Sequence, residues 1–197
     1  MNVLDLLARV AGTYRDVAWY KDTGSAETGS GDETVRRRAF FATEFARHQQ
    51  YFYTFEDQVT QPGCVPLRGF LRWSGGETLL SAFGEVERLG SFSEGVAGMG
   101  GGTDNVGYVI PRLLLPEELG EYFWRITTLR EPRLVEAGVE TGAECLVVAG
   151  IHPWNDEYAV KLFVDKHTHL LRRIEQSWSF EGVQRFSTIL YEPQGGA

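Results

Sequence analysis

The segment KLFVDKHTHLLRRIEQSW, residues 161–178, is either a metal-binding strand or a plain β-hairpin. Asp165, His167 and His169 would share one face of a straight strand, where three such ligands can hold zinc. However, this polar stretch lies between two apolar runs, and Asp and Thr at turn positions bond to their own backbone. A turn would scatter the three side chains. The pattern therefore favours a hairpin over residues 161–176 that turns at residues 165–168 without a metal.

The same hairpin pattern recurs along the chain. Residues 69–83, GFLRWSGGETLLSAF, are predicted to form two strands joined by a turn at Gly75 and Gly76. Residues 133–152 are predicted to form two more strands, joined by a turn near Thr141 and Gly142. Residues 34–46, 49–59 and 183–193 also alternate as strands do, whereas the Gly/Ser-rich residues 23–33 are typical of a loop. About eight to ten sequential strands predict a curled antiparallel sheet.

Two regions have helical patterns instead. The apolar residues Val3, Leu7, Val10 and Tyr14 form one stripe, which predicts a helix over residues 2–15. Residues 91–126 predict a mostly helical insertion that could act as a lid, with residues 98–102 as a flexible Gly-rich hinge and a helix beginning near Pro116. The predicted fold class is therefore α+β: a curled antiparallel sheet, or half-barrel, with an N-terminal helix and a helical lid.

Composition and charge predict a single domain and argue against several classes of function. The 197 residues include 43% hydrophobic residues, which predicts one domain over residues 1–197 with a sizeable core. A net charge of −8 argues against nucleic-acid binding, because the basic cluster at residues 36–38 is too short to reverse it. No apolar run is long enough for a transmembrane helix. Asp5 interrupts the apolar N-terminal stretch, so no signal peptide is visible.

The residue patterns do not predict an enzyme. The glycines at residues 100–102 are not followed by the Lys-Ser/Thr of a phosphate-binding loop, and GSFSEG misses the nucleophile-elbow motif by one residue. No nucleophile, base and orienting group can be assembled, and no cofactor or metal site is predicted. Cys64 and Cys145 could form one disulfide.

Aromatic residues are dense on consecutive predicted strands. Tyr51, Tyr53 and Phe55 share one face of their strand, and Leu71 and Trp73 share one face of the next. Two interpretations stand at this point. These side chains form the core of a large sheet packed on the N-terminal helix, or they line an apolar cavity on a concave face that helices fill only in part.

The order of the segments carries a resemblance to a known family. The pieces VETGAECLVVAGIH, residues 139–152, and KLFVDKHTHLLRRIE, residues 161–175, resemble the closing strands of the outer-membrane lipoprotein-sorting, LolA/LolB-like superfamily, which includes RseB-like periplasmic sensor domains. The resemblance covers most of the chain in order. It implies a half-barrel whose helical lid encloses an apolar cavity for acyl chains, and a location in the periplasm or cell envelope.

Under that resemblance we expect a non-catalytic binding or carrier protein for lipid, a lipidated protein or another apolar ligand. The alternative is an envelope sensor or protein-interaction domain without a small ligand. The period-2 alternation and the expected lid together predict the residues of the apolar cavity, which are Tyr51, Tyr53, Phe55, Leu71, Trp73, Leu113, Leu114 and Leu115.

Overall fold

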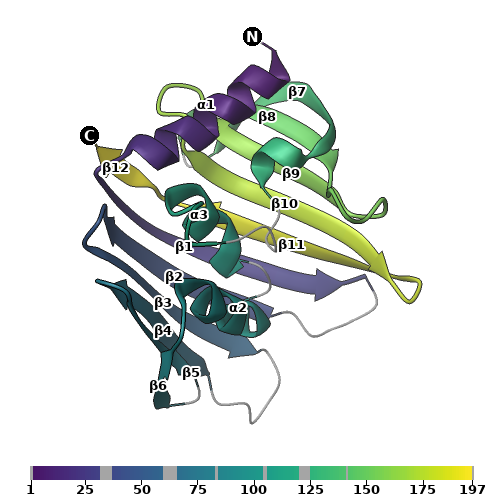
Figure 1. Cartoon of the computed structure of the whole chain (residues 1–197). Helices are drawn as coiled ribbons and strands as arrows, with labels where there is room; N and C mark the ends of the chain where they lie inside the picture. Colours follow the sequence, from purple (N-terminus) through teal and green to yellow (C-terminus); the bar gives the residue numbers. More distant parts are fainter. Residues whose placement is uncertain are drawn as a thin grey trace.

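A large open antiparallel sheet forms the frame of the protein, and helices lie on one of its faces (Figure 1). The structure is a computed structural model, and it describes residues 2–31, 37–59, 66–82, 84–103, 106–119, 125–140 and 142–196. The sheet has twelve strands in the order β6-β5-β4-β3-β2-β1-β11-β10-β9-β8-β7, with β12 paired to β1. The α+β half-barrel class is confirmed.

The elements have the following bounds. The helices are α1 (Val3–Asp16), α2 (Phe92–Thr103), α3 (Val106–Leu114) and the short 3-10 helix η1 (Ile126–Thr128). The strands are β1 (Trp19–Ser30), β2 (Arg37–Ala46), β3 (Gln50–Val59), β4 (Leu67–Ser74), β5 (Glu77–Ala82), β6 (Glu85–Leu89), β7 (Arg130–Glu140), β8 (Ala143–Ile151), β9 (Ala159–Asp165), β10 (Leu171–Phe180), β11 (Val183–Tyr191) and β12 (Gln194–Gly196).

The predicted hairpin at residues 161–176 is confirmed, and Asp165 explains its geometry. One carboxylate oxygen accepts the backbone N–H groups of His167 and Thr168, both at 2.9 Å. The other accepts two bonds from the Arg172 guanidinium, at 3.1 and 2.9 Å. Burial alone would raise the pKa of Asp165, but the hydrogen bonds from Thr168, His167 and Arg172 outweigh it and lower that pKa. The carboxylate therefore stabilises the turn.

Two glycines at the β4–β5 turn confirm the second predicted hairpin. Gly75 and Gly76 both have positive φ angles, of 58° and 84°, as a tight two-residue turn requires. The β7–β8 hairpin is confirmed as well, and Gly142 has a φ of 80° at its turn. The sequence leaves open whether Cys64 and Cys145 pair, and Cys64 lies outside the described residues.

The loop predicted over residues 23–33 is wrong in its described part, because β1 runs through it to Ser30 as a central strand between β2 and β11. Small residues are needed there because the neighbours approach closely. A Cβ on Gly24 would lie 2.2 Å from the Leu190 carbonyl oxygen and 2.3 Å from Cζ of Phe41. With β1, β6 and β12, the sheet has more strands than the eight to ten expected.

The helical insertion is present, but its predicted internal boundaries are wrong. Residues 98–102, the expected hinge, belong to α2, which continues to Thr103. The next helix, α3, ends before Pro116, which lies in a turn, so no helix begins within the described residues 115–119. Residues 120–124, where that predicted helix would continue, lie outside the described residues. Glycine serves close packing in α2, since a Cβ on Gly95 would lie 2.5 Å from Cδ1 of Leu71 on the sheet.

Candidate functional site

Helices cover one face of the sheet (Figure 1), and the predicted cavity residues on the sheet are buried or partly buried. Tyr51, Tyr53 and Phe55 on β3 are at most 5% exposed, and Leu71 on β4 is 1% exposed. Tyr51 pairs with Trp73, which is partly buried, and Tyr53 pairs with Leu71. The predicted alternation of β3 and β4 is therefore correct.

Helix α2 packs directly on this face. The ring of Phe92 lies 5.2 Å from that of Tyr51 and 5.8 Å from that of Trp73, between centroids. The predicted lid residues Leu113, Leu114 and Leu115 are also buried, in α3 and just after it. The structure thus brings seven of the eight predicted residues into one apolar core cluster, and the eighth, Trp73, packs against it. Whether they contact a ligand stays a prediction.

A buried carboxyl group lies on the same face. Asp22 of β1 is 4% exposed, and one of its oxygens accepts the hydroxyl of Tyr20 at 2.7 Å. Burial raises the pKa of Asp22 to about 6, although the bond from Tyr20 opposes the shift. The sequence reasoning missed this residue because it assigned the neighbouring segment to a loop. The sequence pattern that could have revealed Asp22 is the alternation that places it on the same strand face as Tyr20.

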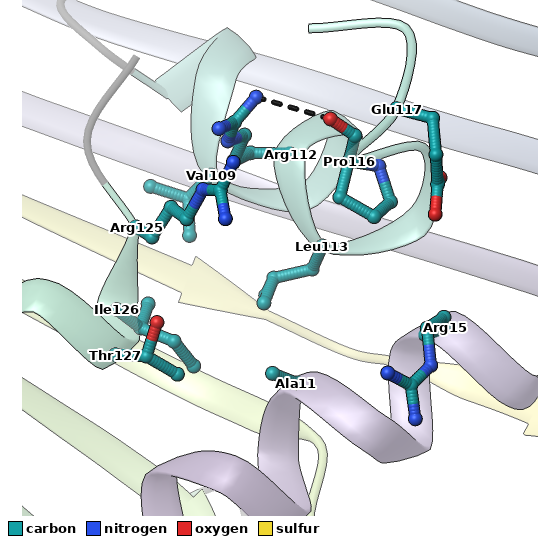
Figure 2. A pocket seen from close by; sticks show the side chains of 10 residues that line it. All are labelled: Ala11, Arg15, Val109, Arg112, Leu113, Pro116, Glu117, Arg125, Ile126 and Thr127. Atoms are coloured by element: carbon teal, nitrogen blue, oxygen red, sulfur yellow. Dashed lines mark hydrogen bonds between the residues drawn. The ribbon is translucent and has the colours of Figure 1, made fainter. Parts of the chain in front are cut away.

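A pocket of about 360 Å³ opens between α1, α3 and η1 (Figure 2). This volume is at the lower end of the range for small-molecule sites. The described residues that line it are Ala11, Arg15, Val109, Arg112, Leu113, Pro116, Glu117, Arg125, Ile126 and Thr127. Leu113 is the one predicted cavity residue among them. The pocket therefore lies among the helices and shares Leu113 with the predicted cavity residues.

Three arginines distinguish this pocket from an ordinary apolar hollow. Arg112 of α3 is only 4% exposed, and its guanidinium donates to the carbonyl oxygen of Pro116 at 3.2 Å. Arg15 comes from the last turn of α1, and Arg125 immediately precedes η1. The sequence reasoning missed all three. A signal existed for Arg112, which is the single charged residue within the apolar run VIPRLLL.

Arg47, in the turn between β2 and β3, holds the pocket's helices in place. Its guanidinium donates to the carbonyl oxygens of Tyr14 at 3.0 Å and Val17 at 2.9 Å, at the end of α1. It also donates to the carbonyl oxygen of Leu114, at the end of α3, at 3.4 Å. One cation thus satisfies carbonyl groups at two helix C-termini, where the helix dipole favours positive charge.

Within the described residues, no three His, Cys, Asp or Glu side chains come together as a metal site would require. None of the described helices has the length and apolarity needed to cross a membrane.

Comparison with known proteins places this geometry in a known fold. No protein-family description matches the sequence, and no curated protein is detectably similar to it. Solved structures do match. LprF from Mycobacterium bovis has a TM-score of 0.54 at 10% identity, covering 99% of this chain and 93% of LprF. The lipoprotein LppX from Mycobacterium tuberculosis has a TM-score of 0.53 at 9% identity, covering 96% and 93%.

MucB from Pseudomonas aeruginosa, solved as a complex with MucA, has a TM-score of 0.52 at 14% identity and covers all of this chain. This chain shares the fold of LprF, LppX and MucB, and the fold that the sequence resemblance implied is confirmed. It spans 59% of the length of the matched chain in the MucA/MucB structure, so it corresponds to only part of that protein. At these identities the likeness establishes the fold alone, and the function must be argued from the site.

Proposed function

We propose that this chain is a non-catalytic binding or carrier protein for lipid, for the acyl chains of a lipoprotein or for another ligand with an apolar part. The observation that carries the proposal is the pocket between α1, α3 and η1, with Val109, Leu113 and Ile126 in its wall. The fold supports it, because α1 and α3, which line the pocket, lie on one face of the sheet (Figure 1).

The inner face is the set of predicted cavity residues on the sheet, which are Tyr51, Tyr53, Phe55, Leu71 and Trp73. We further propose that this inner face provides the rest of the apolar surface. Leu113 lines the pocket and belongs to the same core cluster as Tyr53 and Leu71. Movement of α2 and α3 away from the sheet would expose that surface to a ligand chain. Burying on the order of 300 Å² of apolar ligand surface is worth several kcal/mol before ordering costs, which is compatible with micromolar affinity.

Titration with the neutral fluorescent probe N-phenyl-1-naphthylamine tests the proposal. We expect saturable binding by the wild-type chain, and mass spectrometry of a solvent extract should find co-purified lipid. Leu113→Asp and Trp73→Glu place a charge on the proposed surface, so both should abolish probe binding if the fold survives. Arg72→Glu is the matched control, because Arg72 lies on the opposite face of β4 and is exposed. Equal binding by Trp73→Glu and the wild type would reject the role of the inner face.

A second function, a sensor or protein-interaction domain without a small ligand, is favoured by one specific observation. The inner face is filled, since Tyr51 and Trp73 already pack against Phe92 of α2. The complex of MucB with MucA is compatible with such a role for the fold. Protein that binds no probe and yields no lipid would support this function and reject the carrier.

A further inference from the structure

We propose that the pocket between α1, α3 and η1 is specific for an amphipathic anion, whose carboxylate or phosphate lies between Arg112 and Arg125 and whose hydrocarbon part lies along Val109, Leu113 and Ile126. This inference rests on the proposed binding function and names the chemical class of the ligand.

The position of Arg112 is the first argument. Its side chain lines the pocket although the residue is only 4% exposed, so an anion in the pocket reaches a guanidinium that is shielded from bulk water. Charge pairs are screened less in such surroundings than at the surface. A guanidinium also presents a planar fork of N–H donors that matches carboxylate and phosphate oxygens. Its bond to Pro116 fixes the orientation of this fork.

The balance of charge in the pocket is the second argument. The charged residues among its described lining are Arg15, Arg112, Arg125 and Glu117, which sum to a positive charge. The whole chain carries a net charge of −8. A concave site whose net charge is opposite in sign to that of the whole molecule focuses its electric field and attracts a small anion.

The arrangement of these groups is the third argument. Figure 2 shows Arg112 and Arg125 towards one end of the pocket, and Arg15 and Glu117 towards the other. The apolar side chains Leu113 and Ala11 lie between the two ends, and Ile126 lies beside Arg125 at the first end. A ligand with one anionic group and one hydrocarbon chain matches this separation of charged and apolar side chains.

Calorimetric titration of the full chain with laurate, dodecyl phosphate and dodecanol tests the inference, because the three share one hydrocarbon chain and differ in the head group. We expect at least one of the two anions to bind about tenfold more tightly than dodecanol, as a charge-assisted hydrogen bond would provide. Tighter binding of laurate would indicate a fatty acid as the natural source, and tighter binding of dodecyl phosphate a phospholipid.

Arg125→Met is the primary variant, because Arg125 is exposed and its replacement should not disturb folding. It should weaken binding of the preferred anion about tenfold and leave dodecanol unchanged. Arg112→Gln should act in the same direction, with circular dichroism checking its fold. Arg88→Met removes the same charge from a side chain that is 75% exposed on β6, outside the described pocket lining, and should have no effect.

Three results would overturn the inference. Equal affinity for dodecanol and both anions would refute anion recognition and leave the carrier function standing. Loss of anion binding in Arg15→Met but not in Arg125→Met would refute the placement of the head group. No binding of any of the three compounds or of the neutral probe would reject the carrier function itself.

Discussion

The backbone N–H of Leu171 donates a hydrogen bond of 2.9 Å to the hydroxyl oxygen of Tyr14, joining residues 157 positions apart in the chain. Both residues are fully buried, so this bond fixes α1 to the first residue of β10. It holds one wall of the pocket, because Ala11 and Arg15 of α1 line that wall.

Replacing Tyr14 with Phe should destabilise the protein by about 1–3 kcal/mol, because the buried Leu171 amide loses its partner. Urea unfolding followed by tryptophan fluorescence would measure this. Tyr191→Phe is the matched control, since Tyr191 is equally buried and its hydroxyl has no hydrogen-bond partner among the residues that the structure describes. Its removal should be neutral or stabilising. Equal losses in the two variants would contradict the role of the Tyr14 hydroxyl.

Replacing Arg47 with Met should destabilise α1 and α3 together, because one guanidinium bonds to the carbonyl oxygens of Tyr14, Val17 and Leu114. We expect a loss of about 1–3 kcal/mol in the free energy of unfolding, and faster amide hydrogen exchange at the end of α3. Arg88→Met, at an exposed position, should change neither quantity. Unchanged exchange in α3 would show that packing alone holds this helix.

Replacing Gly95 with Ala should push α2 away from the sheet. The new Cβ would lie 2.5 Å from Cδ1 of Leu71 and 2.9 Å from Cγ2 of Thr78, both buried. Overpacking of this kind costs about 1–3 kcal/mol. Gly12→Ala in α1 should instead stabilise by about 0.5–1 kcal/mol, because its Cβ would meet nothing closer than 4.0 Å. Thermal unfolding of both variants should therefore shift the melting temperature in opposite directions.

The buried carboxyl of Asp22 should make stability depend on pH. Because burial raises its pKa to about 6, the folded state holds a proton that the unfolded chain, with an ordinary pKa near 3.8, releases. This contribution is fully present below the unfolded pKa and is lost as the pH rises through about 6. Asp22→Asn should therefore gain up to about 3 kcal/mol over the wild type above about pH 7, and much less at about pH 4.

Urea unfolding of Asp22→Asn and of wild type across this pH range checks that prediction. The difference between the two proteins isolates Asp22 from the other carboxylates, including Asp165, whose lowered pKa acts in the opposite direction. Asp156→Asn is the control, since the Asp156 side chain is 81% exposed. A difference that does not vary with pH would exclude titration of Asp22 as its cause.

Much of the architecture could be predicted from local patterns. The stripe of Val3, Leu7 and Val10 predicted α1 correctly, because an amphipathic helix depends on residues three and four apart. The alternation of Tyr51, Tyr53 and Phe55 predicted the buried face of β3, and the glycines of the β4–β5 turn predicted a hairpin. Each of these features arises within a few residues, so the sequence by itself determined it.

Contacts between distant residues decided the rest. Position 24 of β1 requires glycine because the Leu190 carbonyl and the Phe41 ring occupy the space a side chain would need, and position 95 of α2 requires it because the Leu71 side chain does. The pocket combines Arg15 of α1 with Arg112 of α3 and Arg125 before η1, which no short-range pattern relates. Local propensity depends on residues that are neighbours in the sequence, whereas burial and close approach depend on residues that are far apart in it. Only the tertiary structure therefore placed these groups together.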